Sequence, residues 1–465
     1  MKVYAVVLAA GKGTRMKSSK PKVVHEVLYK PMINHVVDEL KLLGVEETIV
    51  VVGHEAAQVE AIVDNVTFVY QTEQLGTGHA VLQAKDILKD KEGITIVLNG
   101  DAPLIRKETL EGLIEYHKTN QNSGTVISCD CDLSLPFGRI IKEDNQVKGI
   151  VEFKDLLESQ NHITEMNAGE YCFDNQALFA ALDKVTNQNA QNEYYITDVI
   201  GIMNEQGLKV DAYKINDFNE VGGINDRAQL AEATQILRNR INKELLLDGV
   251  NIIDPANTYI GRDVVIGEET TIEPGCIIKG KTMIGKNCHI GPYCEFTNVE
   301  IKDNVEIKFS VISDSIIENG VDIGPYARLR TNCHIMENAH LGNFVEMKKA
   351  YFGKGSKASH LTYVGDAEVG CDVNMGCGTI TVNYDGKNKS LTKIEDNAFV
   401  GCNVNLIAPV TIKKNAFIAA GSTITKDVEE DAMGIARARQ ENKDGYSQVL
   451  KDIRMKKFED LKKKK

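Results

Sequence analysis

Several features that would assign the chain to a broad class at once are missing from its 465 residues. It contains ten cysteines, but none forms a Cys-x-x-Cys pair or a zinc-type spacing. No apolar stretch is long enough to span a membrane, and the short run after Met1 leads into glycines without a cleavage-like site. An excess of positive charge is also absent, because the formal net charge is −12, which argues against general nucleic-acid binding. We therefore expect a cytoplasmic protein with free thiols that neither binds nucleic acid nor inserts into a membrane.

The strongest positive signal is a series of aliphatic residues that recur every six positions. The series comprises Ile260, Ile266, Ile272, Ile278, Ile284 and Ile290, then Val299, Val305, Val311, Ile317, Ile323, Leu329, Ile335 and Leu341, and finally Ile394, Val400, Leu406, Ile412, Ile418 and Ile424. Neither the helical period nor the strand period produces such a hexad, whereas a coil that turns a corner every six residues does. Many of these residues precede a glycine, which suits corners that need a positive φ or a close backbone approach. The pattern predicts a left-handed parallel β-helix whose stacked coils cover each other's apolar faces.

The first 226 residues follow a different pattern, in which apolar strands alternate with helices. Predicted strands cover residues 3–9, 48–52, 94–98 and 125–128, and predicted helices include 32–43 and 78–88. This alternation predicts an α/β, Rossmann-like domain with a largely parallel sheet covered on both faces. Ligands bind such sheets outside the carboxyl ends of the strands, so the loops that follow the strands are the candidate sites.

The loop after the first predicted strand is rich in glycine and in cations. It spans residues 8–16 and carries Lys12 and Arg15, and Lys22 follows shortly afterwards. Its spacing is not that of a Walker loop, and Met16 stands where a dinucleotide-binding loop would have its third glycine. Exposed backbone donors and three cations could hold a triphosphate and stabilise charge on its departing part. A tight turn with surface cations is the alternative interpretation.

A single carboxylate follows another predicted strand. Asp101 comes after the apolar run 94–98 and lies between Gly100 and Ala102. A carboxylate at the mouth of a parallel strand, beside a glycine, can hold Mg²⁺ against phosphate oxygens. Taken alone, Asp101 could equally cap a helix.

Together these two loops resemble those of the sugar-phosphate nucleotidyltransferases, whose signature is L-x-x-G-x-G-T-x-M followed by P-K. The segments that resemble the uridyltransferases of this group are 71–78, 137–140, 149–152, 165–169, 193–198 and 221–226. With the hexad region included, the chain resembles the bifunctional GlmU family from Val3 to about Tyr446. The resemblance implies that glucosamine-1-phosphate is acetylated with acetyl-CoA. It also implies that UMP is then transferred from UTP to the product, which would give UDP-N-acetylglucosamine and pyrophosphate.

For uridyl transfer, the resemblance implies a defined set of contacts. Leu8, Ala9, Ala10, Gly11, Gln71, Gly76 and Thr77 would contact the uridine nucleotide, Lys22 and Arg15 the phosphates, Asp101 and Asn225 the Mg²⁺ ion, and Gly138, Glu152 and Asn167 the N-acetylglucosamine part. The sugar phosphate attacks the α-phosphorus of UTP. This reaction demands alignment and charge neutralisation rather than a protein nucleophile.

An amphipathic helix is predicted between the two patterned regions. Leu230, Ala233, Leu237 and Ile241 have helical spacing, and we interpret residues 227–248 as a linker helix of about 30 Å. The resulting plan assigns residues 1–226 to a uridyltransferase domain, 227–248 to the linker, 249–437 to an acetyltransferase β-helix and 438–465 to a tail. The basic run 462–465 at its end is expected to be solvated.

Polar residues and one break interrupt the hexads. Arg330 and Glu346 stand next to aliphatic residues of the repeat, which we call rungs. The repeat stops after Thr381 for an insertion over 382–389. Insertions in a solenoid usually lie on its binding face. The resemblance makes His360 the general base that takes a proton from the glucosamine amine, with Glu346 orienting its ring. The remaining implied contacts are Arg330, Lys348, Tyr363 and Asn374 with glucosamine-1-phosphate, and Cys377, Asn383, Tyr384, Cys402, Ala420 and Arg437 on the acetyl-CoA side.

Two cysteines depart from the pattern of the family, which has alanine and serine where this chain has Cys377 and Cys402. Both are small, so we expect the shape of the pocket to be kept, whereas a hydroxyl hydrogen bond at position 402 would be lost. An acyl-cysteine mechanism is the alternative, although an amine that attacks acetyl-CoA directly needs no covalent relay.

The resemblance further implies a homotrimer with shared acetyl-transfer sites, and the exposed edges of a β-helix favour self-association. Two other functions stay open on the residues alone. One is a nucleotidyltransferase of another specificity whose β-helix serves regulation or assembly, against which Lys348, His360 and Asn383 argue. The other is a scaffold with an inactive nucleotide-binding domain, against which Lys22 and Asp101 argue.

Overall fold

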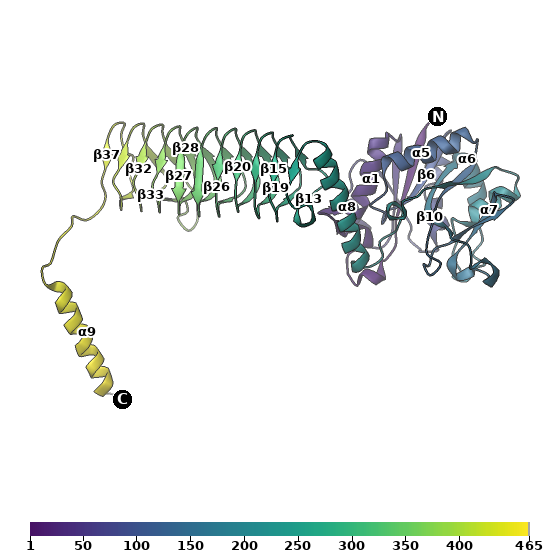
Figure 1. Ribbon diagram of the computed structural model, residues 1–465, viewed down its shortest axis with the longest axis horizontal. Coiled ribbons are helices and arrows are strands. Elements are labelled where there is room, and N and C mark those ends of the chain that lie inside the picture. The colour runs from purple at the N-terminus through teal and green to yellow at the C-terminus, as the bar shows by residue number, and fades with distance from the viewer. Residues whose placement is uncertain (464–465) are drawn as a thin grey trace. The chain divides into compact units, whose positions relative to one another are not determined.

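The computed structural model describes residues 1–463, and Lys464 and Lys465, at the end of the predicted basic tail, lie outside the described residues. By its contacts the chain divides into two compact units. The first comprises residues 1–264 with 278–280, and the second comprises 265–277 with the residues from 281 onward. The first unit is an α/β domain, and the second is a column of stacked strands (Figure 1). Among the described helices, none combines the length and the apolar character that crossing a membrane requires.

The first unit is built on a nine-stranded sheet with the main order β11-β7-β10-β6-β1-β4-β5. Its strands are β1 (Val3–Ala9), β4 (Glu47–Val52), β5 (Thr67–Tyr70), β6 (Ile94–Asn99), β7 (Gly124–Asp130), β10 (Glu165–Asp174) and β11 (Val210–Lys214), with the hairpin of β8 (Arg139–Glu143) and β9 (Gln146–Val151) beside β10; β2 (Glu26–Val27) and β3 (Lys30–Pro31) pair separately. β1 is parallel to both β4 and β6, whereas β10 is antiparallel to β6 and β7. The four predicted strands and the largely parallel sheet are confirmed, and the antiparallel exceptions are β10 and the β8–β9 hairpin.

Apolar side chains pack on both faces of this sheet, because successive residues of a strand point to opposite sides. In β1, Val6 belongs to one buried cluster and Ala5 and Val7 belong to the other. The helices of the unit are α1 (Met32–Leu43), α2 (Ala56–Glu60), α3 (Thr77–Leu82), α4 (Lys85–Leu88), α5 (Lys107–Thr119), α6 (Asn175–Leu182), α7 (Asp198–Glu205) and α8 (Arg227–Leu247). The predicted helix 32–43 is therefore confirmed as α1.

The helix predicted over residues 78–88 is divided into α3 and α4 instead. The Gln83 side-chain amide donates to the carbonyl of His79 at 2.9 Å, and the Gln83 backbone N–H donates to Ala80. The backbone bond that would continue an α-helix from His79 to Gln83 is thus replaced by a side-chain bond. The helical spacing of the apolar residues does not reveal this competition.

The helix α8 begins at a capped residue and packs within the first unit. The Asp226 carboxylate accepts hydrogen bonds from the backbone N–H groups of Ala228 and Gln229, both at 2.9 Å. Ala233 and Leu237 are buried in a cluster with side chains of β2 and α1. This burial explains why the contacts assign the helix to the first unit.

Short parallel strands stacked on one another form the left-handed β-helix (Figure 1). One flat side contains β12 (Asn251–Ile252), β15 (Thr271–Ile272), β18 (His289–Ile290), β20 (Glu306–Ile307), β22 (Asp322–Ile323), β25 (His340–Asn343), β27 (Lys357–His360), β29 (Asn374–Met375), β32 (Phe399–Val400), β35 (Phe417–Ile418) and β37 (Met433–Gly434). The other sides contain β13 (Tyr259–Ile260), β14 (Val265–Ile266), β16 (Ile277–Lys279), β17 (Met283–Ile284), β19 (Glu295–Ile301), β21 (Val311–Ile317), β23 (Arg328–Leu329), β24 (His334–Ile335), β26 (Glu346–Phe352), β28 (Tyr363–Val369), β30 (Ile380–Val382), β31 (Thr392–Ile394), β33 (Asn405–Ile407), β34 (Val410–Ile412) and β36 (Thr423–Ile424). Residues one coil apart lie in register, as Met347 does with Val364.

The hexad series is confirmed at every position except Val311. Inward-pointing residues such as Ile290 and Ile317 are fully buried, whereas Val311 is 43 % exposed and the adjacent Ile312 takes its place inside. The strand β21 runs through two sides of the coil with a shortened corner, so the buried residues Ile307, Ile312 and Ile317 are spaced by five rather than six. A strict count of six residues therefore places Val311 inside this coil, where the structure has Ile312.

Close backbone approach accounts for the glycines that follow the rungs. A Cβ at Gly342 would overlap the carbonyl of Ser359, and one at Gly285 would lie 2.7 Å from the carbonyl carbon of Lys302. Left-handed backbone at the corners falls often on asparagine instead, as at Asn287 with a φ of 56°. Of the two predicted reasons for glycine, the structure supports the close approach at these positions.

The predicted break in the repeat is a loop between β30 and β31. Tyr384 and Lys389 form an isolated bridge across this loop, and the Ser390 N–H donates to the Asn383 carbonyl at 2.9 Å. The loop is therefore closed by its own backbone. Beyond the last coil, α9 (Tyr446–Lys463) has only exposed side chains.

Candidate functional site

A pocket of about 310 Å³ lies at the carboxyl ends of β1 and β6. These strands are parallel, with Leu8 beside Asn99, so the loops that follow them lie side by side. The pocket is lined by Leu8, Ala9, Ala10, Gly11, Lys22, Val23, Gln71, Gln74, Gly76, Thr77, Ala80, Asn99, Asp101 and Glu193. The structure thus gathers in one cavity most of the residues predicted to contact UTP. Gln74 and Glu193 were not predicted as contacts, although both stand in the segments that carried the resemblance.

Two cationic side chains contact two side-chain oxygen groups beside this pocket. The Lys22 ammonium forms an ion pair with the Asp101 carboxylate and donates to Asn225 Oδ1 at 3.0 Å. Arg15 donates to the same Asn225 oxygen at 2.7 Å. The Ile224 N–H donates to the Asp101 carbonyl at 3.0 Å, which holds the end of the sheet domain against the Asp101 loop.

The oxygens of Asp101 and Asn225 fit a divalent cation. The Lys22 ammonium contacts both of them, so both face a common position suited to positive charge. A Cβ at Gly223 would lie 3.3 Å from Asp101 Oδ1, so a larger residue there would crowd the carboxylate. No group of three or more His, Cys, Asp or Glu residues gathers into a metal site anywhere in the described chain. A pair of protein oxygens is nevertheless enough for Mg²⁺, which keeps several waters and binds substrate phosphates as well.

One wall of the pocket is fixed by side-chain amides. Gln71 donates to the Gly76 carbonyl at 3.0 Å, and Gln74 donates to the Ala10 carbonyl at 2.7 Å. Gly76 has a φ of 112°, and a Cβ there would lie 2.6 Å from the Tyr194 carbonyl oxygen. Only glycine suits this turn, which places the N-terminus of α3 at the pocket.

Gly138, Glu152 and Asn167 form a neighbouring group outside that cavity. The Asn167 N–H donates to the Gly138 carbonyl at 2.9 Å, and Thr197 donates to Glu152 at 3.2 Å. A Cβ at Gly138 would lie 3.5 Å from Glu152 Oε2. Burial raises the pKa of the Glu152 carboxyl above its ordinary value. The structure brings these three predicted sugar contacts together.

On the β-helix, cations gather beside Glu346. Arg330 donates to Glu346 Oε1 at 3.1 Å from the preceding coil. The charges of Lys389 and Arg330 lower the pKa of the Lys348 ammonium. Lys389, in the inserted loop, was not predicted as a contact, and its signal was the insertion itself. Three neighbouring cations make this corner suited to a phosphate group.

His360 has a partner that the sequence did not single out. Its Nδ1 lies 2.7 Å from Asn343 Oδ1, and the two residues are in register one coil apart in β27 and β25. Glu346, which was predicted to orient the ring, pairs with Arg330 instead. The 17-residue separation of Asn343 and His360 equals one coil here, and this spacing could have identified the pair.

Four of the residues predicted on the acetyl-CoA side, namely Cys377, Cys402, Ala420 and Arg437, lie at or near one corner of successive coils. The N–H groups of the residues after Cys402 and Ala420 donate to the carbonyls of Cys377 and Cys402 at 2.7 and 2.8 Å. Arg437 is close to the same corner, since a Cβ at Gly421 would lie 3.9 Å from its Cδ. His360 belongs to this corner as well, at the end of β27.

Other predicted residues lie on the remaining sides of the coil. Asn383 donates to the Asp366 carboxylate, and the Tyr384 hydroxyl donates to the Gly386 carbonyl at 2.6 Å. Tyr363 begins β28, and Asn374 begins β29 on a different flat side. Arg330 follows β23 and Lys348 lies within β26, whereas His360 ends β27 and Cys377 and Cys402 follow β29 and β32. One chain therefore presents the two groups at separate corners.

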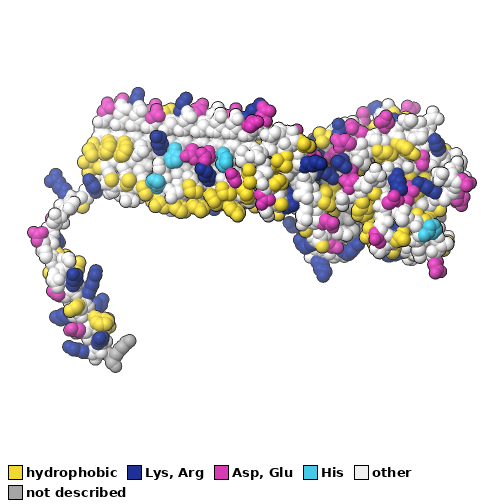
Figure 2. Space-filling view, in the orientation of Figure 1, with side chains coloured by type: hydrophobic (Ala, Val, Ile, Leu, Met, Phe, Trp, Pro, Cys, Tyr) yellow, Lys and Arg dark blue, Asp and Glu magenta, His cyan; other side chains and the backbone are white. Residues whose placement is uncertain are grey.

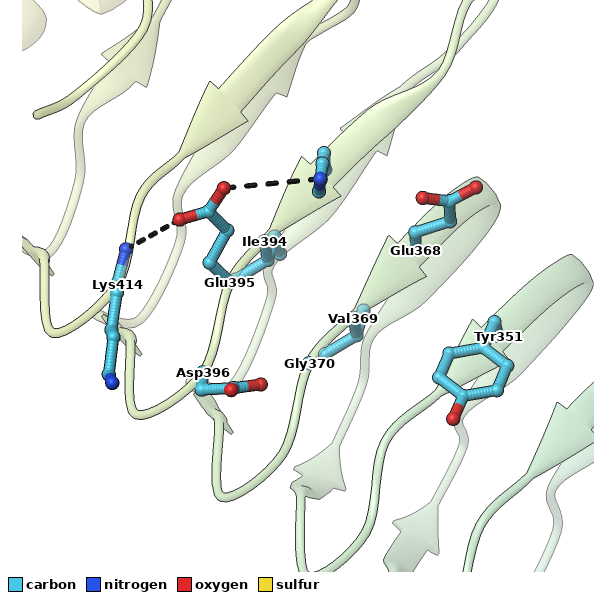
Figure 3. A pocket seen from close by; sticks show the side chains of 9 residues that line it. Tyr351, Glu368, Val369, Gly370, Ile394, Glu395, Asp396 and Lys414 are labelled. Atoms are coloured by element: carbon cyan, nitrogen blue, oxygen red, sulfur yellow. Dashed lines mark hydrogen bonds and ion pairs between the residues drawn. The ribbon is translucent and has the colours of Figure 1, made fainter. Parts of the chain in front are cut away.

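A larger cavity of about 570 Å³ contains none of the predicted residues. Figure 3 shows its wall, where the Glu395 carboxylate lies 4.0 Å from the Lys393 ammonium and accepts from the Lys414 backbone N–H at 3.1 Å. Tyr351 and Glu368 line the same cavity. Size alone does not identify the functional site.

The fold and these two groups of residues define a nucleotidyltransferase unit joined to a hexapeptide-repeat transferase unit. The model of the MobA-like NTP transferase domain matches residues 5–190, and that of the bacterial transferase hexapeptide matches residues 391–426. The model of the GMPPB C-terminal domain matches residues 260–357.

Curated relatives extend the similarity over nearly the whole chain. "Bifunctional protein GlmU" of Geobacillus sp. (strain WCH70) is 53 % identical over 448 residues, which cover 96 % of this chain and 98 % of the relative. The proteins of that name from Geobacillus thermodenitrificans (strain NG80-2) and Listeria monocytogenes serotype 4a (strain HCC23) are 54 % and 51 % identical, and each alignment covers 97 % of this chain and 99 % of the relative. The chain belongs to the bifunctional GlmU family. A solved UDP-glucose pyrophosphorylase with UDP-glucose covers 52 % of this chain and 100 % of its own at 20 % identity, and its TM-score of 0.42 is too low to support an argument.

Proposed function

We propose that the chain makes UDP-N-acetylglucosamine in two reactions. The β-helix acetylates glucosamine-1-phosphate with acetyl-CoA and releases CoA. The first unit then transfers UMP from UTP to N-acetylglucosamine-1-phosphate and releases pyrophosphate. Membership of the bifunctional GlmU family supports both activities. The structural observation that carries the proposal is the meeting of Lys22, Asp101 and Asn225 beside a pocket of nucleotide dimensions.

In uridyl transfer, the pocket holds UTP and the neighbouring group holds the sugar. Leu8 to Gly11, Gln71, Gly76 and Thr77 contact the nucleotide, Lys22 and Arg15 the phosphates, and Gly138, Glu152 and Asn167 the N-acetylglucosamine. A phosphate oxygen of the sugar phosphate bonds to the α-phosphorus as the bond from that phosphorus to the pyrophosphate oxygen breaks. The chain contributes alignment and positive charge, so no covalent intermediate with the protein is needed.

Asp101 and Asn225 are the proposed ligands of Mg²⁺. When bound, the ion would neutralise charge on the phosphate oxygens. Lys22 contacts both ligand residues in the structure, and we propose that its ammonium turns to the phosphates once the nucleotide enters. The release of Lys22 from Asp101 then frees the carboxylate for the metal.

In acetyl transfer, His360 is the proposed general base. Its imidazole takes a proton from the glucosamine amine as the nitrogen bonds to the thioester carbonyl carbon and CoA leaves as the thiolate. Arg330 and Lys348 bind the sugar phosphate through charge-assisted hydrogen bonds. Tyr363 and Asn374 complete the sugar contacts, and Cys377, Asn383, Tyr384, Cys402, Ala420 and Arg437 lie on the acetyl-CoA side.

We propose a homotrimer in which neighbouring chains complete each acetyl-transfer site. Arg330 and Lys348, the cations suited to a phosphate, lie at a different corner of the coil from His360, and this separation supports the arrangement. Figure 2 shows hydrophobic side chains gathered along one edge of the β-helix. The rings of Tyr293, Phe309 and Tyr326 lie in a row with neighbouring centroids 5.9 and 5.5 Å apart, and both tyrosines are more than half exposed. We place the enzyme in the cytoplasm, since all ten cysteines are free thiols.

One assay tests the proposal. The protein is supplied with glucosamine-1-phosphate, acetyl-CoA, UTP and Mg²⁺, and UDP-N-acetylglucosamine, CoA and pyrophosphate are measured. All three products are expected. In a parallel reaction, N-acetylglucosamine-1-phosphate is supplied directly with UTP and Mg²⁺. If pyrophosphate forms there while no CoA is released in the first reaction, the chain is a nucleotidyltransferase with a regulatory or assembly β-helix. If no product forms in any reaction, both enzymatic functions are rejected in favour of a scaffold.

A further inference from the structure

The side chain of Asn343 is placed to hold the His360 ring. Both residues end short parallel strands of adjacent coils, and they pair directly in register. Their side chains meet at 2.7 Å between His360 Nδ1 and Asn343 Oδ1. The Asn343 carbonyl also accepts the Leu361 N–H at 3.0 Å, a backbone bond that any substitution at 343 can keep. The side-chain contact can therefore be altered without removing the coil-to-coil bond.

The chemistry of this contact determines which ring nitrogen is free. An amide oxygen only accepts hydrogen bonds, so Nδ1 carries the hydrogen. The lone pair of the neutral ring then lies on Nε2, which is the nitrogen available to take a proton from a substrate. Partners that fix the tautomer of a histidine in this way set its reactivity as a base or as a ligand.

His360 differs in this respect from the other histidines of the β-helix. His289, His334 and His340 each lie beside a carboxylate, at 3.3, 2.8 and 2.9 Å. A carboxylate stabilises the charged imidazolium, whereas an amide oxygen orients the ring without adding charge. A general base must be unprotonated when the substrate arrives, so the neutral partner suits His360 and a carboxylate would not.

We propose that Asn343 is a positioning residue for acetyl transfer, which fixes His360 with its Nε2 lone pair toward the amine. The proposal rests on the acetyl-transfer function proposed above. The titratable groups carried by β25, β27 and the turn after β29 are His340, Lys357 and Cys377, besides His360 itself. His340 is paired with Asp322, so Asn343 is the orienting contact on the coil before His360.

The test compares Asn343→Leu with Asn343→Asp in the full-length protein. Leucine has a similar size but no acceptor, whereas aspartate keeps the acceptor and adds a charge. Asp322→Leu is the matched control, because it removes the acceptor from His340 on the same flat side. The kcat and KM of acetyl transfer are measured from pH 5 to 9, with uridyl transfer and thermal unfolding of the same samples as checks on folding.

We expect Asn343→Leu to lower kcat by about 10- to 100-fold and to leave the KM for glucosamine-1-phosphate unchanged. Asn343→Asp should retain most of the activity at high pH while the acid limb of its pH profile moves up by roughly one unit. The control should resemble the parent. A parental kcat and pH profile for Asn343→Leu would overturn the proposal, and so would equal losses in both variants with no movement of the acid limb. If the leucine variant fails to fold, the pH profile of the aspartate variant decides.

His360→Gln distinguishes a failure of this proposal from a failure of the acetyl-transfer function on which it rests. Full acetyl transfer in that variant would remove the general-base role, and the positioning role with it. An inactive His360→Gln beside a fully active Asn343→Leu would overturn the positioning role alone.

Discussion

The two units of the chain build their polar groups in opposite ways. In the first unit, Arg15 and Asn225 are 210 residues apart and share a hydrogen bond at 2.7 Å. In the β-helix, Asn343 and His360 are 17 residues apart and pair because each coil repeats the one before it. Because the coils of a β-helix repeat regularly, the spacing of two residues in the sequence predicts whether they are neighbours. The sheet of the first unit instead brings together loops that no local sequence pattern connects. Each unit should therefore respond separately to changes in its own residues.

The largest difference between the effects on the two activities should come from Asp101→Ala. Because Asp101 is the proposed charged ligand of the metal, uridyl transfer should fall by at least about 10³-fold. Acetyl transfer by the β-helix should stay unchanged. Both rates are measured on one preparation, and Asp183→Ala, which removes one end of a surface ion pair with Lys85, is the control. An equal loss of both activities would break the contrast between the units, and an intact uridyl rate would reject the metal assignment.

The difference between the units also explains what the sequence could reveal. The strands 3–9 and 94–98 and the hexads are encoded in local periodicity, so they could be predicted with no knowledge of relatives. The meeting of Asp101 with Asn225 could be predicted only through a resemblance, because nothing local links the two. Glu346 was assigned to His360, yet an opposite charge on the preceding coil, that of Arg330, lies at 3.1 Å. Pattern gives the coil position of a side chain, whereas competition among neighbours decides which partner it takes.

A matched pair in β21 tests whether the β-helix depends on its inward rungs. Ile317 is fully buried, whereas the adjacent Ile316 points outward. Ile317→Ala should lower the free energy of unfolding of the β-helix by about 2–5 kcal/mol, because it removes buried methylenes and leaves a cavity. Ile316→Ala should cost less than about 1 kcal/mol. Thermal and urea unfolding measure both. Similar costs for the two variants would contradict the inward assignment, and a fall in uridyl transfer would show that the units are coupled.

Two buried histidines should make the first unit sensitive to acid. Burial lowers the pKa of His35 and of His117 to about 4, so both stay neutral in the folded unit. In the unfolded chain a histidine takes up a proton near pH 6.5, so the unfolded state binds more protons between about pH 6.5 and 4. Each histidine therefore removes on the order of 2 kcal/mol of stability at pH 5. Burial raises the pKa of the Asp198 carboxyl to about 6, which opposes part of this loss because the folded unit then takes up a proton before the unfolded chain does.

Calorimetry at pH 7, 6 and 5 checks this expectation. The transition that UTP raises is assigned to the first unit. His117→Asn should make that transition less sensitive to acid, even if the variant is less stable at pH 7. The expectation fails if His117→Asn leaves the acid sensitivity of that transition unchanged. The β-helix transition is the comparison, since three of its histidines, His289, His334 and His340, lie at the surface beside carboxylates.

The smallest effect is expected from Cys402→Ser. Cys402 is exposed at a corner of the coil, and direct attack by the glucosamine amine needs no thiol, so acetyl transfer should stay within about twofold of the parent. The same substitution at Cys172, which is fully buried in the first unit, should cost about 1–3 kcal/mol because it buries a hydroxyl in an apolar core. Complete loss of acetyl transfer in Cys402→Ser would favour an acyl-cysteine intermediate at that position. Retention of activity would exclude it there, and Cys377→Ala would be needed to exclude it at the corner one coil earlier.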